Sequence, residues 1–266
     1  MSPMATKTIG GGMMAYEEKG KGEPVVLVHG FPLDSRIWEG QREGLAGNCR
    51  VITPDLRGFG QSSSSAPFSI ESLADDLRTL LKEIGALPCV LGGLSMGGYV
   101  ALAYVKKYRT DLRGLMLIDT RAEGDTPQGR EGRGNMIELV RESGSRAVAD
   151  QMMPKMLAPN EAAARPGVAK NLRAIMEACP PLTIEHALGA MHDRPDFTED
   201  LGSIAVPTLI LVGEQDAITP PDVARKMQEE IPRAVLEVIR GAGHMSPMEQ
   251  PHQVNGAMRK FIGGIA

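Results

Sequence analysis

The segment G-L-S-M-G at residues 93–97 places a possible nucleophile between small residues. It follows an apolar run at residues 89–92 and precedes a helix-like segment. In a sharp turn from strand to helix, a serine side chain projects outwards, and the residues two positions away on either side must be small. Gly93 and Gly97 meet that need. We therefore predict that Ser95 is a nucleophile. The alternative is a glycine-rich turn that carries no chemistry.

A serine nucleophile needs a base, and the sequence offers one histidine in a suitable loop. His244 ends the small-residue stretch G-A-G-H, between the strand-like run at 235–239 and a closing helix that begins near Pro247. His252 falls inside that closing helix. His244 is therefore the predicted base.

The base in turn needs an acid that orients it, and two aspartates are candidates. Asp216 lies in a loop just after the buried strand predicted at 207–213, and Asp119 closes the strand predicted at 115–118. The order nucleophile, acid, base along the chain favours Asp216. Asp119 remains the alternative.

Two backbone amides are placed to bind the negative charge that develops on a substrate carbonyl oxygen. Met96 begins the helix predicted at 96–108, where the helix dipole favours negative charge. Phe31 comes just after the β-branched strand predicted at 25–28. We predict that these two N–H groups form an oxyanion hole and that neighbouring His29 braces the loop.

These segments resemble the α/β-hydrolase superfamily along the whole chain. The motifs that carry the resemblance are H-G-F-P-L-D at 29–34, P-D-L-R-G-F-G-Q-S at 54–62, G-L-S-M-G at 93–97, P-T-L-I-L-V-G-E-Q-D at 207–216 and G-A-G-H at 241–244. Within the superfamily the chain looks most like small esterases and 3-oxoadipate enol-lactonase-like hydrolases, with their cofactor-free haloperoxidase or perhydrolase relatives. Haloalkane dehalogenases and most epoxide hydrolases use an aspartate nucleophile, so Ser95 argues against both.

The elements that must position these residues follow from the apolar runs. Six strands are predicted, at residues 25–28, 51–53, 90–94, 115–118, 209–212 and 235–239. Helical patterns alternate with them, and the clearest has one apolar stripe from Ile70 to Ile84. This alternation predicts an α/β fold with a mostly parallel central sheet and helices on both faces.

The chain of 266 residues fits a single domain, 1–266, with one insertion. Residues 121–196 lack the strand pattern and are predicted to form a helical cap over the site. Arg194 and Asp196 are candidates to pair with each other and so tie the end of this cap to the core. The cap is rich in methionine, and these side chains either line an adaptable pocket or fill the core of the cap. They are Met136, Met152, Met153, Met156, Met176 and Met191.

The charge and composition of the chain bear on which partners it binds and where it is located. A net charge of −4 and a pI near 5.8 provide no electrostatic basis for binding nucleic acid or an anionic membrane. No apolar run is long enough to span a bilayer, and the N-terminus lacks the pattern of a secretory signal. Three cysteines without metal-like spacing favour reduced thiols. We expect a cytoplasmic protein.

The sequence thus predicts a serine hydrolase, free of cofactor and metal, that cleaves a small carboxylic ester or lactone through an acyl-enzyme. Carbon–carbon bond hydrolysis and perhydrolysis are alternatives that use the same three side chains. A further alternative is a ligand receptor that keeps these residues but turns over very slowly.

Overall fold

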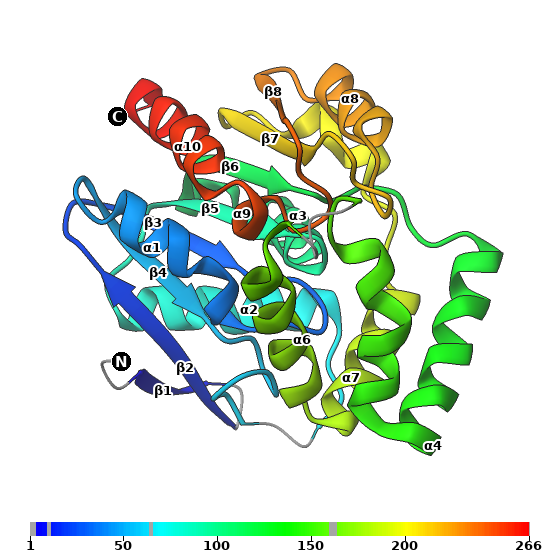
Figure 1. The fold of residues 1–266 in the computed structure, drawn as a ribbon. Helices are drawn as coiled ribbons and strands as arrows, with labels where there is room; N and C mark the ends of the chain where they lie inside the picture. The colour runs from blue at the N-terminus through cyan, green and yellow to red at the C-terminus, as the bar shows by residue number, and fades with distance from the viewer. Residues whose placement is uncertain (1–3, 10–11, 64–65, 160–163, 266) are drawn as a thin grey trace.

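The computed structural model describes residues 4–9, 12–63, 66–159 and 164–265, and its centre is an eight-stranded sheet (Figure 1). The strands are ordered β1-β2-β4-β3-β5-β6-β7-β8. Strands β3 to β8 pair in parallel, whereas β2 pairs antiparallel with both β1 and β4. The bounds are β1 (Ala5–Ile9), β2 (Gly12–Lys19), β3 (Glu23–Val28), β4 (Cys49–Pro54), β5 (Cys89–Leu94), β6 (Leu112–Ile118), β7 (Thr208–Gly213) and β8 (Ala234–Ile239).

All six predicted strands lie within β3 to β8, and the predicted α/β fold is confirmed. Central strands such as β5 and β7 are buried along their whole length, as expected for parallel strands covered on both faces. Strand β1 is mostly exposed. Its sequence therefore lacks the continuous apolar run that marks the central strands.

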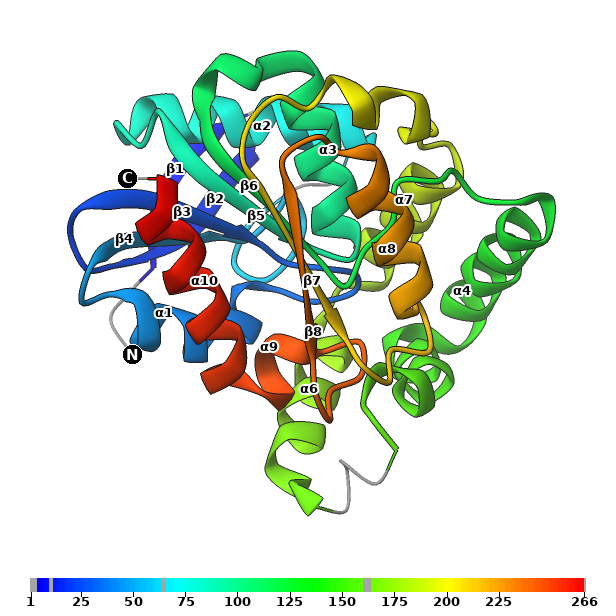
Figure 2. The same ribbon diagram turned by 90° about the horizontal axis from the view of Figure 1, so that it is seen from above.

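Helices cover both faces of the sheet, as Figure 2 shows. On one side lie α2 (Ile70–Glu83) and α3 (Met96–Tyr108), and on the other lie α1 (Glu39–Leu45) and α10 (Pro251–Ile265). Helix α8 (Pro221–Glu230) packs on β7 and β8. The apolar stripe predicted for α2 is buried. The single closing helix of the prediction is instead two helices, α9 (Ser246–Glu249) and α10, because Pro251 starts a new helix.

The segment between β6 and β7 is helical, with α4 (Pro127–Met156), α6 (Pro166–Ala178), α7 (Pro181–His192) and a 3₁₀ helix (Thr198–Ser203). Helix α4 changes direction at Gly144, where φ is 73°. It packs against α6 and α7, and in Figure 1 it lies to the right of the sheet. Three methionines of this segment, Met156, Met176 and Met191, are buried in the hydrophobic core, so they act as packing residues.

The predicted pairing of Arg194 with Asp196 is wrong. Arg194 is almost fully buried, stacks over the ring of Tyr99 and forms its ion pair with Asp125, at 2.8 Å. Asp196 instead accepts hydrogen bonds from the backbone of Gly124 and Thr198. The guanidinium is occupied by this ion pair and by the contact with the Tyr99 ring. Both residues still join the two ends of the helical segment.

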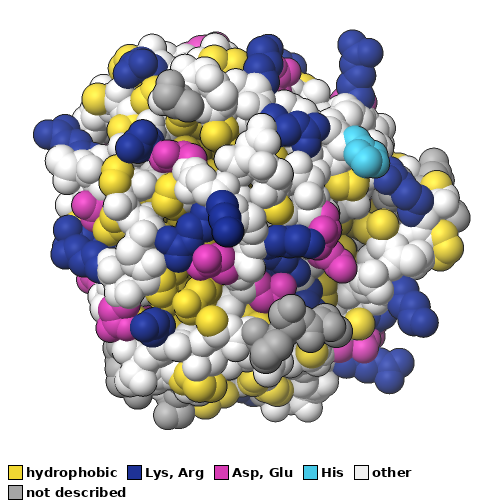
Figure 3. Space-filling view, turned by 90° about the vertical axis from the view of Figure 1, so that its left-hand side faces the viewer, with side chains coloured by type: hydrophobic (Ala, Val, Ile, Leu, Met, Phe, Trp, Pro, Cys, Tyr) yellow, Lys and Arg dark blue, Asp and Glu magenta, His cyan; other side chains and the backbone are white. Residues whose placement is uncertain are grey.

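On the face drawn in Figure 3, basic and acidic side chains lie interspersed rather than in a basic stripe. This arrangement agrees with the small net charge. The helices of the described residues include none with the length and apolar character needed to cross a membrane. Cys49, Cys89 and Cys179 are buried and free, as predicted.

Candidate active site

Ser95 occupies a strained turn between β5 and α3. Its φ and ψ are 53° and −114°, and within the described residues the only other positive φ outside glycine is that of Asp119. Ser95 is the N-cap residue of α3, yet its side chain makes no capping hydrogen bond. The hydroxyl is therefore left available for chemistry.

The glycines around Ser95 are required by close backbone approaches. A Cβ atom on Gly93 would lie 2.0 Å from the carbonyl oxygen of Gly97, and one on Gly97 would lie 2.4 Å from that of Val28. A Cβ atom on Gly30 would lie 3.2 Å from the Cβ atom of Ser95. The loop after β3 therefore packs directly against Ser95.

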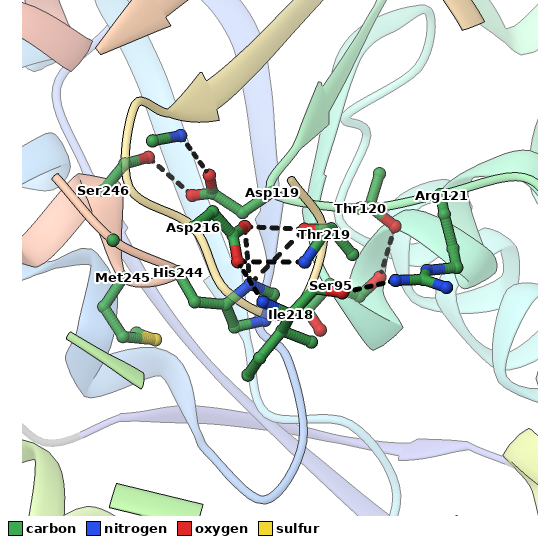
Figure 4. A network of polar contacts seen from close by, with 12 residues as sticks. Ser95, Asp119, Thr120, Arg121, Asp216, Ile218, Thr219, His244, Met245 and Ser246 are labelled. Carbon is green, nitrogen blue, oxygen red and sulfur yellow. Dashed lines mark hydrogen bonds and ion pairs between the residues drawn. The ribbon is translucent and has the colours of Figure 1, made fainter. Parts of the chain in front are cut away.

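His244 and Asp216 form a buried, hydrogen-bonded pair (Figure 4). His244 Nδ1 lies 2.8 Å from Asp216 Oδ2. Within the described chain, the hydrogen bonds of His244 are made only by Nδ1. Its Nε2 atom is therefore the ring nitrogen left to exchange a proton with a nucleophile.

Asp216 is fixed by the loop that follows β7. Its Oδ1 atom accepts hydrogen bonds from the backbone N–H groups of Ile218 and Thr219, at 2.7 and 2.9 Å. The Thr219 hydroxyl donates to Oδ2 at 2.6 Å. Burial raises the pKa of Asp216, but the charge of His244 and hydrogen bonds from His244 and Thr219 outweigh burial and lower it overall. Asp216 is therefore a charged, rigidly held partner for the imidazole.

Asp119 reaches the same edge of the sheet but binds other groups. It follows β6, is fully buried, and accepts hydrogen bonds from the Gly213 N–H at 2.7 Å and the Ser246 hydroxyl at 2.6 Å. Burial, and then the charge of Asp216, raise the pKa of the Asp119 carboxyl well above its usual range. Of the two candidate acids, Asp216 is the one hydrogen-bonded to His244.

The two predicted oxyanion donors also lie beside Ser95. Met96 begins α3 directly after it, and Phe31 follows Gly30, which packs against it. Among the described residues, neither the Phe31 N–H nor the Met96 N–H has a hydrogen-bond partner. Both donors are therefore available to a substrate oxygen.

His29 has a structural role, as expected. Its Nδ1 atom lies 2.8 Å from the carbonyl oxygen of Gly30, and its Nε2 atom accepts a hydrogen bond from the N–H of Leu56. Burial lowers the pKa of His29, which favours the neutral ring that such an acceptor requires. Both ring nitrogens are occupied in bracing the loop.

Sequence reasoning did not identify Thr219, which holds the acid, or Ser246, which binds Asp119. An aspartate followed three residues later by threonine is a common local hydrogen-bonded turn, so Thr219 carried a detectable signal. No local sequence pattern marked Ser246, because its partner Asp119 lies 127 residues away in the chain. In the part of the chain that the structure describes, no cluster of three or more His, Cys, Asp and Glu side chains is placed to hold a metal ion.

Comparison with known proteins identifies the family. A family model described as "Alpha/beta hydrolase family" matches residues 25–257, so the chain belongs to this family. A thermophilic esterase from Thermogutta terrifontis, solved with malate bound, is 41% identical and covers 99% of each chain, with a TM-score of 0.95. The predicted resemblance to small esterases of this superfamily is confirmed.

Two further proteins are similar to this chain, one in structure and one in sequence. An enol-lactonase from Burkholderia xenovorans LB400 has 22% identity and a TM-score of 0.91, covering 97% of this chain and 100% of its own, which shows a shared fold. A putative non-heme chloroperoxidase from Synechocystis sp. is 32% identical, over 93% of this chain and 94% of its own. The family and these neighbours indicate a hydrolase.

Proposed function

We propose that Ser95, Asp216 and His244 form the catalytic triad of a serine hydrolase that cleaves small carboxylic esters or lactones. The observation that carries this proposal is the buried hydrogen bond between His244 and Asp216, at the same sheet edge as the strained Ser95. The similarity to an esterase over nearly the whole chain supports the choice of an ester bond.

The proposed reaction proceeds in two halves. His244 Nε2 accepts the proton of the Ser95 hydroxyl as the oxygen attacks the substrate carbonyl, and the resulting oxyanion accepts hydrogen bonds from the N–H groups of Phe31 and Met96. His244 then donates the proton to the leaving alcohol, which in a lactone stays attached to the acyl group. Water activated by His244 releases the carboxylic acid and restores Ser95.

We further propose that residues 121–196 form a cap over the site. The chain contacts the loops of the site where this region begins (Figure 4). The hydroxyl of Thr120, which directly precedes the region, donates to the carbonyl oxygen of Ser95 at 2.8 Å. Arg121, its first residue, donates to the carbonyl oxygen of Ile218. At the end of α4, the carbonyl oxygen of Met156 accepts a hydrogen bond from the N–H of Met245. These contacts support a cap that joins the loops bearing all three triad residues.

The test is hydrolysis of a panel of p-nitrophenyl esters and small lactones, followed by mass spectrometry of the protein quenched during turnover. We expect an acyl adduct on the peptide that contains Ser95, and no adduct with Ser95→Ala. A wild-type protein that hydrolyses nothing in the panel but binds esters tightly, with a thermal shift, would instead support the receptor alternative.

Perhydrolysis is a second candidate, favoured by the similarity to a protein named as a chloroperoxidase. In this reaction hydrogen peroxide replaces water at the acyl-enzyme, so the products are a peracid and free Ser95. Adding hydrogen peroxide, acetate and bromide should then generate peracetic acid, which oxidises the bromide to hypobromous acid, and this product brominates a dye. The oxidant must disappear in Ser95→Ala, since a route independent of Ser95 contradicts the candidate.

A further inference from the structure

One buried carboxyl group near the site has no part in the proposed reaction. Glu249 is the last residue of α9 and has no exposed surface. Burial of a carboxyl group is unfavourable unless hydrogen bonds compensate for its lost hydration. The groups that it binds therefore show what it does in the fold.

One oxygen of Glu249 holds the backbone on both sides of His244. Oε1 accepts hydrogen bonds from the N–H of Gly243 at 2.9 Å and from the N–H of Met245 at 3.1 Å. Gly243 directly precedes His244, and Met245 directly follows it. A single oxygen atom thus fixes the peptide from which the imidazole projects.

The other oxygen reaches the helical segment between β6 and β7. Oε2 accepts a hydrogen bond of 2.8 Å from the N–H of Ala158, two residues after the end of α4. The two backbones also touch, because a Cβ atom on Gly243 would lie 2.4 Å from the nitrogen of Ala158. Glu249 therefore joins the loop of His244 to the end of α4.

We propose that Glu249 is a positioning residue that sets the place of His244 and couples it to the end of α4. This inference rests on the proposed function, in which His244 is the base. Loss of the carboxylate leaves the buried N–H groups of Gly243 and Ala158 without their acceptor, and the Met245 N–H keeps only the carbonyl oxygen of Met156. The His244 backbone then shifts, and the ring moves relative to Asp216 and the nucleophile.

The test variant is Glu249→Gln, which keeps the size of the side chain but replaces one acceptor oxygen with a donor NH₂ group. In either orientation of the amide, this NH₂ group faces at least one backbone N–H. We expect kcat on p-nitrophenyl acetate to fall about 10- to 100-fold, because a displacement of the base by a fraction of an ångström is costly. KM should stay within about twofold, because no substrate contact is removed.

A second readout reports on His244 without any substrate. We expect the proton in the hydrogen bond between His244 Nδ1 and Asp216 to give a low-field proton resonance in NMR, and this resonance to shift or broaden in Glu249→Gln. Glu249→Asp restores two acceptor oxygens on a shorter side chain. It should recover part of the activity and of the resonance, and it carries the same test if Glu249→Gln does not fold.

Asp76→Asn is the matched control. Asp76 is a buried carboxylate on α2 whose partner is Arg57, so its loss should lower stability but leave kcat and the resonance unchanged. The inference is overturned if Glu249→Gln keeps the kcat and the resonance of the wild type. It is also overturned if Glu249→Gln alters kcat and the resonance no more than Asp76→Asn does. If the wild-type protein hydrolyses no ester or lactone, the proposed function fails. The resonance alone then tests whether Glu249 positions His244.

Discussion

The carboxyl group of Asp119 accepts a hydrogen bond of 2.6 Å from the hydroxyl of Ser246, two residues beyond His244. Its other oxygen accepts from the N–H of Gly213, three residues before Asp216. Asp119 therefore bridges the loops that carry the proposed acid and base (Figure 4). A residue so placed supports the geometry of the pair, whereas Asp216 binds the imidazole itself.

This difference predicts unequal effects of two matched substitutions. Asp216→Asn should lower kcat/KM about 10⁴-fold, because an amide neither stabilises the imidazolium nor holds its reactive tautomer. Asp119→Asn keeps an oxygen acceptor for Gly213 and can bond to the Ser246 hydroxyl through its amide. We expect a loss of about tenfold or less. Steady-state kinetics on p-nitrophenyl butyrate will measure both, and a larger loss in Asp119→Asn would assign the acid to Asp119.

Ser95→Ala should abolish ester hydrolysis without disturbing the fold. The Ser95 side chain makes no capping hydrogen bond, so its removal costs the structure little, while the reaction loses its nucleophile. We expect a fall in kcat of at least about 10⁴-fold. The measurement is a rate assay beside circular dichroism and thermal melting. Near-parental turnover in a folded, freshly purified variant would refute the assignment.

The sequence predicted the sheet well because strands such as β5 and β7 are continuous apolar runs, a pattern that parallel strands with two covered faces produce. It also predicted where Ser95, Asp216 and His244 stand relative to these strands. It could not predict the contact between Glu249 and Ala158, because these residues are 91 positions apart and nothing local marks either one. The same holds for Arg194, whose partner is set by burial beside Tyr99.

The two buried aspartates predict opposite effects of pH on stability. The pKa of Asp216 is lowered from its usual 3.8. The folded state then binds protons less readily than the unfolded state at this site, so the stability from this residue is present above 3.8 and is lost as pH falls through the lowered pKa. Asp216→Asn should therefore show a shallower loss of stability in acid. Urea unfolding at a series of acid pH values tests this, and an unchanged slope would contradict it.

For Asp119 the sign is reversed, because its pKa is raised above 3.8. The folded state holds this proton more tightly, so the stability from Asp119 is complete below 3.8 and is lost as pH rises through the raised pKa. The free energy of unfolding of Asp119→Asn, relative to wild type, should therefore increase as the pH rises from 3.8 through the range of the raised pKa. A constant difference across this range would show that Asp119 does not titrate as its burial implies.

The proposed cap predicts a preference for short acyl chains. Ser95 is only partly exposed, and the residues just after β6 and just after α4 contact the loops around the site. Each methylene that fits the enclosed space adds at most about 1–3 kcal/mol of binding, and one that does not fit adds a steric penalty. The measurement is kcat/KM for a series of p-nitrophenyl esters from acetate to palmitate, assayed below micelle-forming concentrations with Ser95→Ala as the background. We expect the highest kcat/KM among the short chains and a steep decline for longer ones. A maximum at palmitate would mean that residues 121–196 leave an open channel, and the cap would then not enclose the acyl group.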